Sequence, residues 1–471
     1  MLRAALVLLL LPLAAIAPPV TGAATTAAAA STAPSTPDPL RAIVDEALRA
    51  NLGLEQERLA ERRAGAEVRE ARARLLPSIN LDARYSHIEN ATNLGDFINP
   101  AYGALNQLTG TSAFPTDIDL TLPRRYESHL RLVQPLFNEA ARAGLAVASA
   151  RRDGQRMQLA AAARRLAAEA QIAYLEQASA RRVAEIYDAT LATVRENERV
   201  AERLLDAGRA TPEAVQRSRA ERAEVEQSLA EARERQLAAA RAFNRVLKRP
   251  LDATVEAIPD TAFDLPLSPF AGADEAMKRG LAAREELRQV EAGVRTAQAA
   301  KRAATSGMVP SVAGVLDYGF QGNDLSVSDE DHVWSASLAF SWSLFDGGGD
   351  LARRSAAGYE AERARAQKRD IEDRIALEIR TAYEAATVAR QAIVTADVRL
   401  EAAARTFTLV RRRFEEGAAS PYELVDARTS LTNAQLNRVL TAYRYAIRRV
   451  DFERAAALRD IDTGLTKGDR S

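Results

Sequence analysis

The chain has 471 residues, no cysteine, and 64 Lys and Arg against 64 Asp and Glu. Aromatic residues make up 5% and charged residues 27% of the chain, which is typical of long helices laced by ion pairs. The balanced charge gives no reason to expect a nucleic-acid partner. The absence of cysteine excludes disulfides, thiolate metal sites and a lipid anchor on cysteine.

The N-terminus predicts export. Residues 1–24 carry one arginine, an apolar run broken by proline, and then small residues, the pattern of a secretory signal peptide. Residues 25–38, rich in Ala, Ser, Thr and Pro, predict a disordered leader. No later apolar run is long enough for a transmembrane helix, so any membrane-inserted form would have to be a barrel of strands.

The remaining chain contains similar sequence features at a fixed spacing. Three pairs of landmarks recur at an offset of 209 residues: Gly208 with Gly417, Pro212 with Pro421, and Phe243 with Phe452. A fixed offset of this kind indicates an internal duplication. We predict a first repeat over residues 39–260, a second over 261–458, and a C-terminal tail over 459–471.

Each repeat contains two segments in which apolar and polar residues alternate. They lie at about 78–90 and 126–137 in the first repeat, and at about 310–322 and 332–345 in the second. A period of two predicts strands with one apolar face. A longer loop, about residues 90–125, separates the first two strands.

Two tryptophans in the last of these strands favour a membrane. Trp334 and Trp342 share one face and are eight residues apart. At about 3.3 Å per residue they are roughly 26 Å apart, close to the spacing of the aromatic girdles of an outer-membrane barrel. We predict that they belong to such a girdle. Because four strands cannot close a barrel, a symmetric oligomer is required.

Long helices follow the strands. In the second repeat, apolar residues from Ile375 to Phe414 recur in alternating steps of four and three, which predicts a heptad seam. The matching seam of the first repeat is interrupted only by Gln177 and Glu198. A helix over residues 138–206 would span about 100 Å at 1.5 Å per residue, far too long for a compact globule.

Both long helices are expected to end in a tight turn, at about 206–212 and about 415–421. Each turn offers a glycine for a left-handed cap, a hydroxyl residue as N-cap and a proline at the first helical position. These residues are Gly208, Thr211 and Pro212 in the first turn, and Gly417, Ser420 and Pro421 in the second. We therefore predict two helical hairpins.

The order of these elements, with the phrases "LPSINLDARYS", "LRLVQPLFNEAARAGLA", "LAFSWSLFDGGGDLARRSAA" and "FEEGAASPYELVDARTSLTNAQ", resembles the TolC-like outer-membrane efflux proteins, or outer membrane factors. The resemblance implies a mainly α fold with a β-barrel contribution. Tandem-duplicated long α-hairpins would form an α-barrel, and four strands per protomer would join a trimeric, 12-stranded transmembrane β-barrel. It also implies a homotrimeric exit duct in the outer membrane, with a long periplasmic extension.

The resemblance further implies partners and site residues. The duct would serve a periplasmic adaptor and an inner-membrane transporter, in tripartite efflux or type I secretion, and the six turn residues named above would meet the adaptor. Glu423 and Asp426 match the places of acidic residues that face the pore, where a threefold ring of carboxylates would select cations. The alternative is that they only complement the dipole of the helix N-terminus. The first turn has Arg217 instead, which we expect to latch a neighbouring helix to Asp426 in the closed state.

Two other classes share part of this pattern. A periplasmic adaptor would show one hairpin instead of a duplication, and a structural coiled-coil protein would lack the strands. No catalytic triad or pair of carboxylates has a pocket to occupy, so we predict no enzyme and no cofactor. The three histidines, at positions 87, 129 and 332, lack the spacing of metal ligands.

Overall fold

The computed structural model describes residues 39–87, 92–119, 121–122, 126–258, 272–322, 332–416 and 418–459. The predicted signal peptide and leader, Gly417, and residues 460–471 of the predicted tail lie outside the described residues. From Pro39 onward the chain forms one unit by its contacts.

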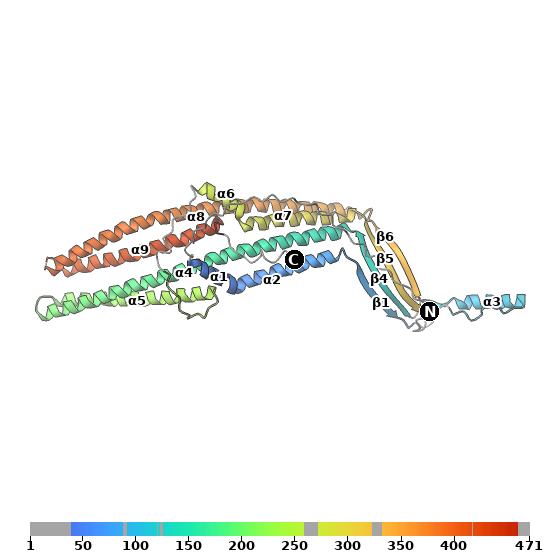
Figure 1. Cartoon of the computed structure of the whole chain (residues 1–471), viewed down its shortest axis with the longest axis horizontal. Coiled ribbons are helices and arrows are strands. Elements are labelled where there is room, and N and C mark those ends of the chain that lie inside the picture. Colours follow the sequence, from blue (N-terminus) through green and yellow to red (C-terminus); the bar gives the residue numbers. More distant parts are fainter. Residues whose placement is uncertain are drawn as a thin grey trace, which may run out of the picture. The chain divides into compact units, whose positions relative to one another are not determined.

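The elements follow in the order α1 (Pro39–Ala50), α2 (Leu52–Ala73), β1 (Ser78–Tyr85), β2 (Thr92–Asn93), α3 (Gly95–Thr109), β3 (Thr121–Leu122), β4 (Tyr126–Phe137), α4 (Glu139–Asp206), α5 (Pro212–Val246), α6 (Ala273–Ala283), α7 (Glu285–Ala304), a 3-10 turn (Ser306–Met308), β5 (Ser311–Gly322), β6 (His332–Ser341), α8 (Gly349–Glu415) and α9 (Pro421–Ala455) (Figure 1). The predicted class is confirmed, since α4–α5 and α8–α9 are long hairpins and four strands form the main sheet.

The main sheet has the antiparallel order β1-β4-β5-β6, so strands of the two repeats meet at β4 and β5. The register gives the sheet two different faces. Leu132 lies opposite Leu316, and Tyr318 lies opposite Trp334, on one face. On the other face Arg131 pairs with Asp317 at 2.7 Å. β1 and β6 are the edge strands.

Two predicted strands are shorter in the structure than the sequence suggested. β6 ends at Ser341, so the prediction that it continues to residue 345 is wrong. Ser341 pairs with Ser311, the first residue of β5, and Pro310 before it has no N–H to continue the ladder. Likewise β1 ends at Tyr85, and residues 88–90 lie outside the described part of the chain.

The segment predicted as a plain loop at about 90–125 contains α3 and the short β2–β3 pair. Its sequence is rich in Gly, Asn and Pro, which are typical of turns. The helix nevertheless forms, because side chains on one of its faces bond to the returning chain, as described below.

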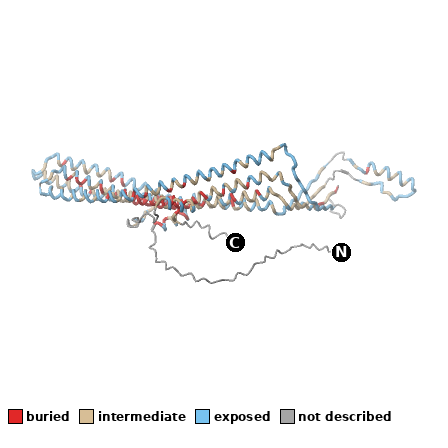
Figure 2. The backbone as a smooth tube through the Cα atoms, turned by 90° about the horizontal axis from the view of Figure 1, so that it is seen from above, coloured by how far each residue is buried: buried red, intermediate tan, exposed pale blue. Residues whose placement is uncertain are grey.

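Each repeat contributes a matching aromatic pair to the helical core. In the first repeat the rings of Tyr174 and Phe243 meet edge to face at 5.5 Å, and in the second Tyr383 and Phe452 do the same at 5.5 Å. Both pairs lie in clusters of buried apolar residues that include the C-terminal part of α9. Figure 2 shows these buried residues gathered along the middle of the helices. The hairpins are therefore anchored near the middle of the helical body and are less deeply buried toward their turns (Figure 2).

The predicted heptad seams lie on the packed faces of α4 and α8. The seam positions of α8 from Ile375 to Phe414 are buried or half-buried. In α4, the seam residue Gln177 is also buried, and Glu198 bonds to Arg222 at 2.7 Å. The ion pair compensates the polar interruption at Glu198, whereas Oε1 of Gln177 is buried without a hydrogen-bond donor in the described chain.

Candidate functional site

No described part of the chain covers the apolar face of the sheet. Its exposed side chains include Ile79, Leu81, Tyr85, Trp334, Leu338 and Phe340, each more than 60% exposed. A contiguous exposed apolar surface of this kind marks contact with lipid or with another protein. Trp334 belongs to this face within β6. Trp342 lies one residue beyond the strand and donates its indole N–H to the carbonyl oxygen of Met308 at 3.2 Å.

The first hairpin turn joins α4 to α5. Gly208 has a φ of +69°, and the backbone N–H groups of Arg209 and Ala210 bond to the carbonyl oxygen of Leu204 at 2.7 and 3.1 Å. This closes the helix C-terminus as a left-handed cap does. Pro212 begins α5, as its fixed φ favours.

Thr211 holds the N-cap position of α5, but its hydroxyl makes no capping hydrogen bond. The predicted N-cap position is therefore confirmed, without a capping hydrogen bond from the side chain. Its hydroxyl interacts with Glu213 instead. The pKa of Glu213 is lowered, first by a hydrogen bond from its own backbone N–H and then by Thr211.

The second turn is capped more completely. The Ser420 backbone N–H donates to Oε2 of Glu423 at 2.7 Å, and the Glu423 N–H donates to Oγ of Ser420 at 3.2 Å. This is a capping box, completed by Pro421 at the first position of α9. The Ser420 N–H is the main reason that the pKa of Glu423 is lowered. Asp426 lies nearly one turn further along α9 and is exposed.

The two hairpins touch near their turns. The Arg217 guanidinium of α5 lies 5.1 Å from the centre of the Tyr422 ring of α9. Further from the turns, Glu221 of α5 and Arg428 of α9 form an ion pair in which the side chains are 11% and 5% exposed. Burial raises the pKa of Glu221, more than the nearby Arg428 lowers it.

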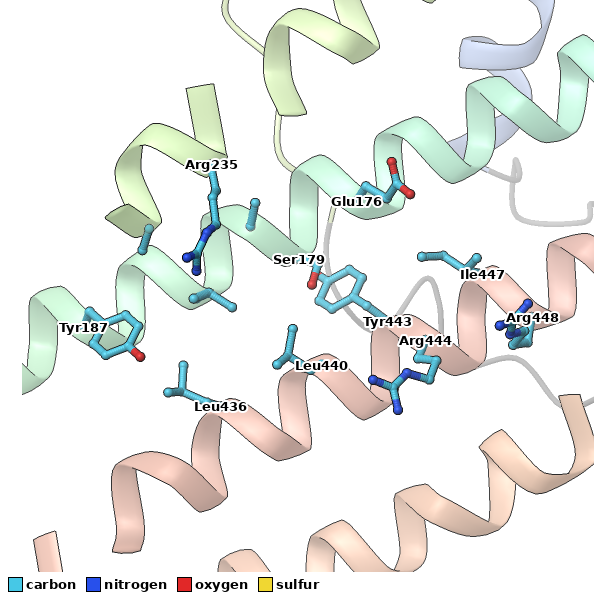
Figure 3. A pocket seen from close by; sticks show the side chains of 13 residues that line it. Glu176, Ser179, Tyr187, Arg235, Leu436, Leu440, Tyr443, Arg444, Ile447 and Arg448 are labelled. Carbon is cyan, nitrogen blue, oxygen red and sulfur yellow. The ribbon is translucent and has the colours of Figure 1, made fainter. Parts of the chain in front are cut away.

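A groove separates the hairpins beyond this contact (Figure 3). It lies between α4, α5 and α9, has a volume of about 570 Å³, and combines apolar side chains such as Leu436 and Leu440 with charged ones such as Glu176 and Arg444. Between the groove and the turns, the hydroxyls of Thr190 and Thr432 approach to 3.5 Å. Polar contacts between α4–α5 and α9 therefore replace the apolar core as the turns are approached.

A membrane-spanning helix and a metal site each place requirements on the described residues. None of the described helices is both long and apolar enough to cross a bilayer. Among the side chains that the structure describes, no group of three His, Asp or Glu residues is placed to hold a metal ion.

A model of the outer membrane efflux proteins matches residues 43–247 and 277–457, most of both repeats. The chain belongs to the outer membrane efflux protein family. The predicted resemblance to TolC-like proteins is thereby confirmed, and the protein is a transport protein of the outer membrane. No curated protein matches the chain.

Solved structures of outer-membrane channels share the fold of this efflux protein. The CmeC outer membrane channel of Campylobacter jejuni is 17% identical, with a TM-score of 0.73 over 90% of this chain and 88% of that chain. The outer membrane protein VceC of Vibrio cholerae is 17% identical, with a TM-score of 0.70 over 88% and 95%. The open state of the MtrE outer membrane channel of Neisseria gonorrhoeae is 18% identical, with a TM-score of 0.70 over 88% of each chain.

The structure of this efflux protein gives Arg217 a partner that the sequence did not suggest. Within the chain it lies over Tyr422 and not against Asp426. Glu221 and Arg428 were also missed. A signal existed for Arg428, because it lies four residues after the buried Leu424 and next to the buried Ala427, on the face where the apolar pattern places the core.

We expect Arg217→Gln to speed amide hydrogen exchange in the first turns of α9 by about two- to fivefold, the range of an exposed cation–π contact. The change removes the charge over Tyr422 while keeping a polar side chain. Exchange measured by mass spectrometry on peptides covering residues 420–430 provides the test. Arg209→Gln, in the first turn itself, is the matched control; equal exchange in both variants would show that the contact does not hold α9.

Proposed function

We propose that three copies of the chain form an exit duct in the outer membrane, with the strands in the membrane and the helices in the periplasm. The observation that carries this proposal is the two-faced sheet. Its apolar face is exposed along all four strands, whereas the opposite face carries the ion pairs Arg131–Asp317 and Arg84–Glu127, both at 2.7 Å. Such alternation suits lipid outside and water inside a barrel.

The sheet edges support a trimer. Each copy offers four strands, and its edges β1 and β6 have no partner strand within the described chain. Lipid does not tolerate unpaired backbone N–H and C=O groups, so a ring must close. Three copies related by threefold symmetry would pair each β6 with the next β1 and give 12 strands.

The hairpin turns are the proposed contact with a periplasmic adaptor, which in turn serves an inner-membrane transporter. Gly208, Thr211, Pro212, Ser420 and Pro421 are compatible with this role because they lie at the ends of both hairpins. The family and its duplicated hairpins favour this duct over an adaptor or a structural coiled coil.

We further propose a carboxylate constriction at the same end, formed by Glu423 and Asp426. The two residues differ in their surroundings. The Glu423 carboxylate is bound to the Ser420 N–H, whereas Asp426 makes no such cap. We therefore expect Asp426 to contribute more to ion selectivity than Glu423.

Single-channel conductance in a planar bilayer tests the duct and the constriction together. The wild type should give a small, cation-selective conductance, because a narrow ring of carboxylates attracts cations. Asp426→Asn should reduce the selectivity more than Glu423→Gln, and Glu423→Ala with Asp426→Ala should abolish it or raise the conductance. Channels that are identical in all variants would contradict the constriction alone. A folded trimer that forms no channel would contradict the duct.

A further inference from the structure

Helix α3 follows β1 and precedes β4, so it lies at the end of the sheet opposite the long helices (Figure 1). The short strands β2 and β3 pair with each other on either side of it. The proposed duct assigns this helix no role.

One face of α3 is closed by the chain that returns from it. Asn99 exchanges two hydrogen bonds with the backbone of Ile118, both at 2.9 Å. Asn106 does the same with the backbone of Phe114, at 2.7 and 3.0 Å. Between them, the ring of Tyr102 lies 5.5 Å from that of Phe114. These residues fix which face of α3 turns outward.

The outward face carries an unpartnered heptad seam. Phe97, Ala101, Ala104 and Leu108 follow steps of four, three and four, which places them on one stripe of the helix. Phe97 is 75% and Leu108 is 85% exposed, so no described element covers them. Burying a Phe or Leu side chain stabilises by about 1.5–3 kcal/mol, which makes an uncovered stripe unfavourable.

The charge of the segment around α3 limits which kind of partner can contact the exposed stripe. From residue 92 to 122 the sequence has three acidic residues and no Lys, Arg or His. Helices that lie on anionic lipid surfaces carry Lys and Arg on their polar face, so this segment is not suited to lipid. The stripe itself is uncharged, so identical copies of it can meet without placing like charges opposite each other.

We infer that the seam of α3 packs against the α3 seams of the two other copies, as a short three-helix coil at the outer end of the duct. Ala101 and Ala104 would allow close approach at its centre, and Phe97 and Leu108 would fill its two ends. The inference rests on the proposed trimer, because only a symmetry axis brings identical seams together.

Cross-linking tests this contact cleanly, because the chain has no native cysteine. Ala104→Cys, on the seam, and Gln107→Cys, exposed on the flank of the same helix, form a matched pair. Each full-length variant is treated in detergent with a short bismaleimide and run on native and denaturing gels. Ala104→Cys should give severalfold more linked pairs of chains than Gln107→Cys. Ala101→Cys repeats the test one turn away, in case one seam variant does not assemble.

The outcomes separate this inference from the proposed function. Native trimers in which Ala101→Cys and Ala104→Cys link no better than Gln107→Cys would overturn the coil and leave the duct intact. A wild type that runs as a monomer would overturn both. A seam cysteine that reacts with water-soluble maleimide in detergent but is protected in lipid vesicles, without cross-linking, would place the stripe on lipid and overturn the coil.

Discussion

Glu221→Leu should lower the free energy of opening the α5–α9 contact by about 3–5 kcal/mol. The change leaves the Arg428 guanidinium buried without its carboxylate, and two of its nitrogens, Nε and Nη1, already meet no acceptor in the described chain. Arginine cannot lose its proton in proteins, so the cost cannot be relieved by titration. We therefore expect the stability of the variant itself to show no pH dependence from this contact between pH 5 and pH 8, because its one remaining charge does not titrate. Hydrogen exchange of α9 amides measures it.

The reverse change, Arg428→Met, should behave differently with pH. The folded-state pKa of Glu221 is already raised above 4.5 by burial, and it rises further once Arg428 is removed. The folded state then binds the proton more tightly than the unfolded chain. The stability gained from this tighter proton binding by Glu221 is fully present below the unfolded pKa of the carboxyl group. It is lost as the pH rises through the folded pKa. The variant should be less stable at pH 8 than at pH 5.

A double variant, Glu221→Leu with Arg428→Met, serves as the control for both. Replacing a buried ion pair by apolar side chains is often neutral or stabilising by about 1–4 kcal/mol, so most of the loss should be recovered. If the double variant is as unstable as the sum of the two single ones, the residues do not act as a pair, and this interpretation of the contact is wrong.

Gly319→Ala should disrupt the sheet where the two repeats meet. A Cβ atom at this position would lie 2.1 Å from the carbonyl oxygen of Ser128 on β4, which is backbone and cannot rotate away. Overpacking of this kind costs about 1–3 kcal/mol or more. Because β4 and β5 form the centre of the four-stranded sheet, we expect a large loss of the proposed trimer.

Gly314, on the same strand β5, provides the control variant. A Cβ atom at Gly314 would meet no atom within 4 Å, so Gly314→Ala should assemble as the wild type does. Heat-modifiable migration on a denaturing gel reports the assembled form in both variants. Equal assembly of Gly319→Ala and Gly314→Ala would show that the register between β4 and β5 is not as the structure has it.

The sequence predicted most accurately the features that depend on neighbouring residues, namely the helix ends and the two faces of the sheet. The long helices end at Asp206 and Glu415 and restart at Pro212 and Pro421, where glycine, N-cap and proline signals lie within a few residues of one another. The two-faced sheet also followed from the alternation of residue types. These signals are readable because each depends only on neighbours in the chain.

Features that depend on distant residues were missed. The turn-like composition around α3 hid a helix that Asn99 and Asn106 stabilise from across the loop. The end of β6 is set by Pro310, some thirty residues earlier, through the strand that it precedes. The pairing of Glu221 with Arg428 joins two repeats about 200 residues apart, and periodicity in one helix cannot identify such a partner.

The open edges of β1 and β6 have a consequence for how the protein is made. Each copy can complete both aromatic clusters of its helices alone, since Tyr174 with Phe243 and Tyr383 with Phe452 belong to one chain. In the proposed trimer, the edges β1 and β6 are paired only when other copies are present. We therefore expect the helices and the four-stranded sheet to form within each copy, and the pairing of β6 with β1 of the next copy to wait for encounters between copies, so that assembly slows more than proportionally when expression is reduced.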